Sequence, residues 1–171
     1  DPRVRAKNTD VDFPLNDEYK DIIPEMLKHL RYSQIEKLSK KYDLRPGMGL
    51  AAPQLGINKN FFVVCYEVKD GVFDDYILIN PKVISYSEEM IYAGEGEGCL
   101  SVNREVEGIV PRHARITVEA YDLDGNKRKY RVREDLAIAF QHELDHLNGI
   151  LFVDYIDPKD PYKNADLYRE I

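Results

Sequence analysis

The chain has few cysteines, no long apolar run and no recognisable leader. Two cysteines in 171 residues are too few for a disulfide scaffold, which indicates a reducing, cytoplasmic setting. No apolar run approaches the roughly 20 residues that a membrane-spanning helix needs. The first residues, Asp1 to Arg5, lack the apolar run that follows the basic start of a signal peptide. We therefore expect a cytoplasmic protein that does not enter a membrane.

Basic residues are also fewer than acidic ones. The 24 lysines and arginines against 31 aspartates and glutamates give a net charge of −7. A nucleic-acid-binding surface is usually basic, so direct binding of nucleic acid is not expected. Charged residues are interspersed with apolar ones, which favours a globular chain over a disordered one. The length predicts one domain over residues 1–171, with an N-terminus trimmed ahead of Asp1, because no initiator methionine is present.

Two helical segments are expected near the N-terminus. Asn16 is a good N-cap, and apolar residues recur at helical spacing from Ile22 to Leu30. Pro24 lies within this pattern and lacks a backbone donor, so we expect it to kink or split the helix. A second, short and charged helix is predicted over residues 34–42.

The middle of the chain shows patterns that are typical of strands. Strands are predicted over residues 61–68, 76–86, 116–121 and 130–133. Gly71 and Gly125 mark turns, and Pro81 is expected either to interrupt its strand or to produce a bulge. A helix follows from about Glu134, and residues 150–156 are expected to be extended. These elements predict an α+β fold, in which antiparallel β-sheets pack around a central metal-binding helix and another helix lies at the N-terminus.

The central helix carries the pattern His-Glu-x-x-His. Residues four apart lie on one face of a helix, so His142 and His146 can bind the same metal ion. Glu143 follows the first histidine, a position from which a carboxylate reaches a metal-bound water without binding the metal. The pattern fixes only three residues, so a helix with two histidines by chance is the alternative.

Two histidines leave a catalytic metal short of protein ligands, and Cys99 is the best third one. It lies in a glycine-rich segment, residues 93–101, which predicts irregular or extended backbone. Attack of water on an acyl group produces an oxyanion, for which the side chain of Gln54 and the backbone N–H of Leu100 are candidate donors. This set of residues predicts hydrolysis of an acyl derivative, an amide above all.

Asp145, His113 and Cys65 also carry side chains of types that occur at metal sites. Asp145 is either a supporting partner of the site, with Arg112 as its mate, or a solvated helix residue. His113 has no partner at ligand spacing, so we do not place it at the site. Cys65 lies in an apolar run and is expected to be a small buried residue.

Three motifs together resemble, in this order, the signature motifs of the bacterial peptide deformylases. They run from Gly47 to Gln54, from Glu97 to Ser101 and from Gln141 to His146. The resemblance covers nearly the whole chain. The segment 33–46 and the ending without a long C-terminal helix resemble the second class of the family, which is common in Gram-positive bacteria.

The resemblance implies an enzyme that removes the formyl group from the N-terminal formylmethionine of new polypeptides and releases formate. It also implies a role for each motif residue. The metal ligands would be Cys99, His142 and His146, the general base and acid would be Glu143, and the formyl oxygen would be bound by Gln54 and the Leu100 N–H.

Substrate contacts are implied in the same way. The substrate-binding residues would be Met48, Gly49, Glu97, Gly98, Ile138, Ala139 and His142. The backbone around Gly49 would pair with the substrate as a strand does, and the methionine side chain would enter an apolar pocket near Met48, Leu100, Ile138, Ala139 and His142.

The resemblance further implies one divalent metal ion, Fe²⁺ in the cell, with Zn²⁺, Ni²⁺ or Co²⁺ able to occupy the site in a purified sample. The implied partners are N-formylmethionyl nascent peptides, with transient association with the ribosome. We expect a monomer that binds neither nucleic acid nor a membrane.

Two alternatives use the same helix pattern. A zinc peptidase usually takes its third ligand downstream as Glu or His, whereas this chain offers Asp154 and Glu170 there and no histidine. A non-catalytic metal-binding module would close its metal with four protein ligands, and the spare Cys65 has no partner ligand near it in the sequence.

Overall fold

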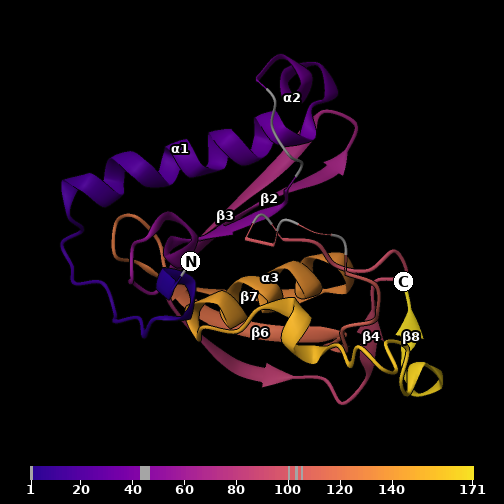
Figure 1. Ribbon diagram of the computed structural model, residues 1–171. Helices are drawn as coiled ribbons and strands as arrows, with labels where there is room; N and C mark the ends of the chain where they lie inside the picture. Colours follow the sequence, from indigo (N-terminus) through magenta and orange to yellow (C-terminus); the bar gives the residue numbers. More distant parts are fainter. Residues whose placement is uncertain (1, 43–46, 100, 103, 105) are drawn as a thin grey trace.

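A computed structural model describes residues 2–42, 47–99, 101, 102, 104 and 106–171 (Figure 1). The larger of its two sheets is antiparallel and has the strand order β1-β2-β3-β6-β7. Its strands are β1 (Gly49–Ala51), β2 (Phe61–Lys69), β3 (Val72–Tyr86), β6 (Arg115–Tyr121) and β7 (Lys127–Arg133). The smaller sheet has the order β5-β4-β8, formed by β5 (Arg112–His113), β4 (Met90–Tyr92) and β8 (Arg169–Glu170).

Three α-helices accompany the sheets in the described ranges. They are α1 (Asp17–Gln34), α2 (Glu36–Tyr42) and α3 (Glu134–Leu147), and short 3₁₀ turns lie at Pro2–Arg5, Ala52–Leu55, Phe152–Tyr155 and Ala165–Leu167. No described helix is both long and apolar enough to cross a membrane. The predicted α+β fold, with antiparallel sheets around a central helix, is confirmed.

The turns and the bulge form where the sequence predicts them. Gly71 joins β2 to β3 with φ of +73°, and Gly125 lies between β6 and β7 with φ of +82°, a backbone region that glycine enters without strain. The pairing of β3 with β6 shifts register between Ile79 and Lys82, around Pro81, which has no N–H to give to a ladder.

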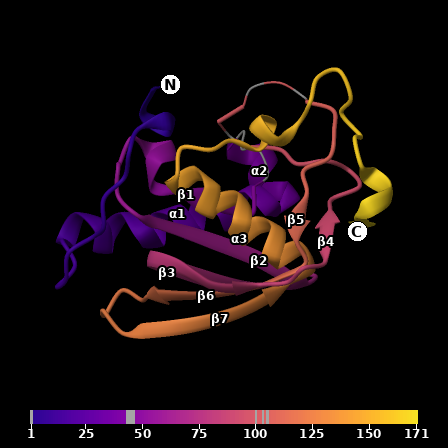
Figure 2. The same ribbon diagram turned by 90° about the horizontal axis from the view of Figure 1, so that it is seen from below.

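The larger sheet is covered on both faces, because β2 alternates between two cores. Phe62 and Val64 belong to the core that contains α3, whereas Phe61, Val63 and Cys65 belong to the core that contains α1. All five side chains are at most 1% exposed. Figures 1 and 2 show α1 and α3 on opposite sides of the strands. The burial of Cys65 is as predicted.

Of the two effects expected of Pro24, a kink or a split of the first helix, the split does not occur. Asn16 accepts the backbone N–H of Glu18 as an N-cap, and α1 then runs as one helix past Pro24. Ile23 and Leu30 are fully buried on opposite sides of the proline along the helix. Burial of each of these side chains contributes about 1.5–3 kcal/mol, so the two together offset the roughly 3 kcal/mol that proline costs inside a helix. Helix α2 begins at Glu36, two residues later than predicted.

The expectation of an extended segment at 150–156 is also wrong, because Phe152–Tyr155 forms a 3₁₀ turn. The Asp154 carboxylate accepts the N–H of Leu151 at 3.0 Å and pairs with Arg5 at 2.6 Å, which holds the turn. Phe152 is thereby buried with its ring centroid 6.0 Å from that of His142. The turn thus closes one side of the site described next.

Candidate functional site

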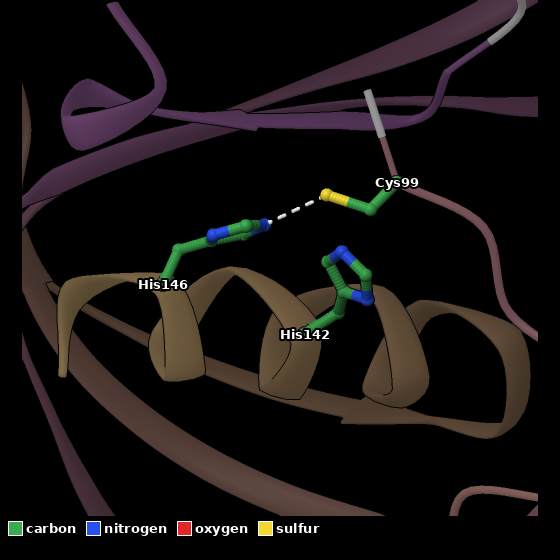
Figure 3. Close-up of side chains that lie close together, drawn as sticks. All are labelled: Cys99, His142 and His146. Atoms are coloured by element: carbon green, nitrogen blue, oxygen red, sulfur yellow. Dashed lines mark hydrogen bonds between the residues drawn. The ribbon is translucent and has the colours of Figure 1, made fainter. Parts of the chain in front are cut away.

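Helix α3 and the loop after β4 bring three metal-ligating side chains together. His142 and His146 project from successive turns of α3, with ring centroids 5.1 Å apart. Cys99 faces them from the loop, and its Sγ lies 3.1 Å from Nε2 of His146 (Figure 3). One ligand atom from each of the three residues lies within 4.8 Å of the other two. The structure therefore brings together the three side chains that the sequence predicts as ligands, in a group that could hold a metal ion.

The donor set of this cluster fits a divalent transition metal. His142 gives Nδ1 to a carboxylate oxygen of Glu97 at 2.9 Å, which leaves its Nε2 for an ion, as is usual for a metal-binding histidine. Nδ1 of His146 is buried without a hydrogen-bond partner among the described residues. One sulfur and two imidazole nitrogens leave a coordination position open, which is typical of catalytic rather than structural sites.

Glu97 is itself held by a buried arginine. Arg112, 3% exposed, donates Nε and Nη2 to the two oxygens of Glu97, each at 2.9 Å, and Nη1 to Asp145. Tyr155 also donates its hydroxyl to Asp145 at 2.8 Å. Asp145 is therefore a supporting partner of Arg112, the first of the two alternatives considered above. The pairing of Arg112 with Glu97 was missed.

The two histidines differ in protonation. Burial lowers the pKa of His142, but its hydrogen bonds with Cys99 and Glu97 outweigh burial and raise the pKa to about 10. Burial lowers the pKa of His146 to about 3, and the positive charge on His142 acts in the same direction. In the metal-free protein, the positive charge therefore resides on His142, where Glu97 balances it at 2.9 Å.

Glu143 lies in a dry environment beside the ligands. It is 2% exposed, and its Oε2 has no hydrogen-bond partner among the described residues. Burial raises the pKa of this carboxyl to about 7. A Cβ on Gly49 would lie 2.8 Å from Oε2 of Glu143, so the glycine is what lets the strand β1 approach the carboxylate. Glu143 can exchange a proton near neutral pH.

Gln54 reaches the same cluster from the 3₁₀ turn that follows β1. Its Oε1 accepts the backbone N–H of Ala51 at 2.8 Å, which fixes the orientation of the amide. Its Nε2 then points at Ser101 Oγ, 3.2 Å away, and at Cys99 Sγ, 3.7 Å away. The other expected donor, the backbone N–H of Leu100, lies outside the described residues.

A cavity of about 360 Å³ opens onto these groups. Every described residue that was expected to bind substrate lines it: Met48, Gly49, Glu97, Gly98, Ile138, Ala139 and His142. Leu100, the remaining pocket residue, is outside the described residues. Gly47, Ala93, Gly96 and Asp135 also line the cavity and were missed. Asp135 precedes Ile138 by three residues on the same helix face, which is a signal that the sequence contains.

His113 lies away from the cluster, as expected. Its Nδ1 contacts the carbonyl oxygen of Ser87 at 2.7 Å, and its ring packs on Tyr86 with centroids 4.3 Å apart. It does not belong to the metal-ligating group.

Comparisons of the sequence with known proteins match this chain to one family. The family model described as polypeptide deformylase matches residues 1–162. A peptide deformylase of Macrococcus caseolyticus is 50% identical over 163 residues, which are 95% of this chain and 89% of that protein. Peptide deformylase 2 of Bacillus anthracis is 45% identical over 166 residues, which are 97% of this chain and 90% of that protein.

Solved structures agree with the sequence matches. The peptide deformylase of Thermotoga maritima superposes with a TM-score of 0.70 at 34% identity, covering 92% of this chain and 93% of that one. A probable peptide deformylase from Synechococcus phage S-SSM7 superposes with a TM-score of 0.72 at 35% identity, covering 91% of this chain and 95% of that one.

Proposed function

The chain belongs to the peptide deformylase family and removes the N-formyl group from nascent peptides, and from this premise we propose how its own residues carry out the hydrolysis. The observation that carries the proposal is the convergence of Cys99, His142 and His146 at one point, beside a cavity that Cys99, His142 and Glu143 line. The whole stretch 1–171 is proposed to act as one catalytic domain.

The proposed metal ligands are Cys99, His142 and His146. When bound, a divalent ion supplies Lewis acidity, which lowers the pKa of a water molecule and polarises a carbonyl group. The family resemblance favours Fe²⁺ in the cell, and Zn²⁺, Ni²⁺ or Co²⁺ in a purified sample, since thiolate and imidazole ligands suit all four. Glu97 keeps the ring of His142 turned toward the ion through the 2.9 Å contact with Nδ1.

Glu143 is proposed as the proton carrier of the reaction. Its carboxylate takes a proton from the attacking water as the new C–O bond forms at the formyl carbon. It then gives this proton to the amide nitrogen as the C–N bond breaks, which releases formate and a free N-terminal amine. Its burial at 2% exposure excludes bulk water that would otherwise compete for the proton.

Negative charge that develops on the formyl oxygen needs donors that are already in place. Gln54 is proposed as one of them, because its Nε2 faces the cluster while its Oε1 is held by Ala51. The Leu100 backbone N–H is proposed as the second. Donors held in this way are worth about 10²–10³ in rate each.

The substrate is proposed to add a strand beside β1. Strand β1 is an edge strand of the larger sheet. Among the described strands it pairs only with β2, so its other edge has no strand partner. Backbone pairing at Gly49 would hold the peptide, and the wall formed by Met48, Ile138, Ala139 and His142 would take the methionine side chain. Glu97 and Gly98 line the same cavity and are proposed to contact the substrate as well.

The proposed setting is a cytoplasmic monomer that acts on N-formylmethionyl chains and associates transiently with the ribosome. The family match supports the proposed substrate, and no helix in the described part of the chain is long and apolar enough to cross a membrane.

The decisive measurement is formate release from formyl-Met-Ala-Ser by anaerobically prepared protein, with metal content determined on the same sample. Glu143→Ala should keep about one metal per chain and lose at least about 100-fold in turnover. Glu25→Ala, at an exposed position of α1, is the matched control and should change neither. Near-full activity of Glu143→Ala would refute the proton role. Cleavage of unformylated peptides without formate release would favour a peptidase instead.

A further inference from the structure

Strand β8 lies beside the substrate cavity, but none of the proposed steps of deformylation uses it. It pairs with β4 in parallel, with Ile91 beside Arg169 and Tyr92 beside Glu170 (Figure 1). The family model matches residues 1–162, so β8 lies outside the part of the chain that the model covers. The segment of β8 nevertheless contacts two elements that line the cavity, the loop after β4 and helix α3.

The backbone of Ile171, the residue after β8, holds the loop after β4 on both sides of Ala93. Its N–H donates to the carbonyl oxygen of Tyr92, and its backbone oxygen accepts the N–H of Gly94, each at 3.0 Å. A Cβ on Gly94 would lie 2.9 Å from Cγ of Glu170, so this glycine lets the two segments approach closely. Ala93 lines the cavity, so this part of the cavity wall is held by the segment of β8.

The side chain of Ile171 supports a second part of the wall. It packs against a small buried cluster formed by Ile91, Ala114 and Ile138, and Ala93 packs against the same cluster. Ile138 is 8% exposed and lines the cavity from α3. Ile171 is not one of the described residues that line the cavity. It therefore supports Ala93 and Ile138 from behind, where the substrate does not reach.

Arg169 fixes β8 to the start of α3. Its guanidinium pairs with the two carboxylate oxygens of Glu134 at 2.7 and 2.9 Å, and with Glu89 at 2.9 Å. Glu134 is the first residue of α3 and has φ of +54°, a backbone conformation that is strained for a residue other than glycine. Arg169 is 45% exposed, so these ion pairs contribute little stability by themselves. They place β8 on the helix, and Ile171 makes the contact with the cavity wall.

We propose that Ile171 is a positioning residue, which sets the room available to the first side chain of the substrate. The proposal rests on the function proposed above, in which that side chain lies against Ile138. When a packed side chain is truncated, its neighbours relax into part of the space that it leaves. Without the Ile171 side chain, Ile138 and Ala93 would recede from the cavity, so a longer first side chain would be accepted. Glu143 and the metal ligands would keep their places.

The test compares formate release by the full, metal-loaded chain from two formyl tripeptides. They differ only in the first residue, which is norleucine, of the length of methionine, or 2-aminooctanoate, which is two methylene groups longer. The wild type should favour norleucine by about tenfold or more in kcat/KM. Ile171→Ala should reduce this preference at least about threefold, and should raise KM for formyl-Met-Ala-Ser while kcat stays within about twofold of the wild type. Ile171→Val, which removes one methyl group, should show an intermediate preference.

Two controls separate this role from a general loss of stability. Ile23→Val removes a methyl group from the core that contains α1, and it should lower Tm without changing the preference between the two tripeptides. Leu167 lies shortly before β8 and is 69% exposed, so Leu167→Ala should change neither Tm nor the preference.

An unchanged preference in an Ile171→Ala variant that still releases formate would overturn the positioning role and leave the proposed function intact. An equal change in Ile23→Val would also overturn it, because lowered stability would then be the cause. Absence of formate release by the wild type from either tripeptide would overturn the proposed function, and the positioning role with it.

Discussion

Replacing Arg112 by methionine should destabilise the protein strongly. The guanidinium is 3% exposed and makes three hydrogen bonds to two carboxylates, two of them to Glu97 at 2.9 Å. Methionine fills part of the space but leaves Glu97, whose side chain is 6% exposed, with His142 as its remaining cationic contact and leaves Asp145 without its arginine. Breaking a buried ion pair in this way costs about 3–5 kcal/mol. For a protein of this size, that cost corresponds to a fall in Tm of about 6–20 °C.

The assay is thermal unfolding of the metal-free protein, followed by circular dichroism near pH 7. Arg128→Met is the matched control, because Arg128 pairs with Asp122 at 3.0 Å while 59% exposed. Such surface pairs are worth at most about 1 kcal/mol, so the control should lose less than about 4 °C. Glu97→Gln/Arg112→Met should be more stable than Arg112→Met, because the double variant no longer buries that unpaired charge.

The pH dependence of the same variant gives a second check. Burial raises the pKa of the Glu97 carboxyl, but hydrogen bonds from Arg112 and His142 outweigh burial and hold this pKa below its usual 4.5. Because the folded pKa is lowered, the stability from Glu97 is present above about pH 4.5 and is lost as the pH falls through the folded pKa. Without Arg112, burial should raise the pKa, so the variant should gain stability on acidification.

The difference in Tm between wild type and Arg112→Met should therefore narrow as the pH falls from about 7 to about 5. Equal losses in Arg112→Met and Arg128→Met would refute the reasoning. A difference in Tm that stays constant over this pH range would refute it as well.

Two further substitutions are Pro24→Ala, which tests the cost of proline inside α1, and Gly49→Ala, which tests the close approach of β1 to Glu143. Pro24→Ala should raise Tm by about 4–8 °C, because proline costs about 3 kcal/mol inside a helix and recovers at most about 1 kcal/mol by restraining the unfolded chain. Asp21→Ala on the same exposed side of α1 is its control, and a lower Tm for Pro24→Ala would contradict the prediction. Gly49→Ala should lower formate release with metal content unchanged, since its methyl carbon would lie 2.8 Å from Glu143. Gly71→Ala, with open space around the added carbon, should release formate at the wild-type rate, and equal rates for the two variants would exclude the contact as the cause.

Features with a local cause were predictable from the sequence. The N-cap at Asn16, the turns at Gly71 and Gly125 and the bulge at Pro81 depend on the backbone preferences of one or two residues. The spacing of His142 and His146 depends only on the period of the helix that carries them. These predictions therefore did not need the tertiary fold.

Features with a distant cause were not predictable in the same way. The turn at Phe152–Tyr155 depends in part on Arg5, about 150 positions away, and the continuity of α1 depends on the sheet beneath it. The contact between Arg112 and Glu97 needs the loop after β4 to return to β5. The distribution of charge over the surface is a further feature of this kind, because the net charge of the chain does not tell where each charged residue lies. The register of β6 and β7 is what gathers Arg131 and Arg133 with Arg115.

The geometry of helix α3 explains why the short His-Glu-x-x-His motif was enough to predict the site. His142 and His146 face Cys99, whereas Phe140 faces the sheet, where its ring centroid lies 5.6 Å from that of Phe62 and 5.4 Å from that of Tyr76. Both faces belong to one rigid backbone, so the packing of Phe140 sets the rotation of the helix about its axis. That rotation decides whether both imidazoles point at Cys99. A core residue without contact to the ligand group therefore positions it, and the ligand spacing and the apolar spacing of α3 are two consequences of one helical register.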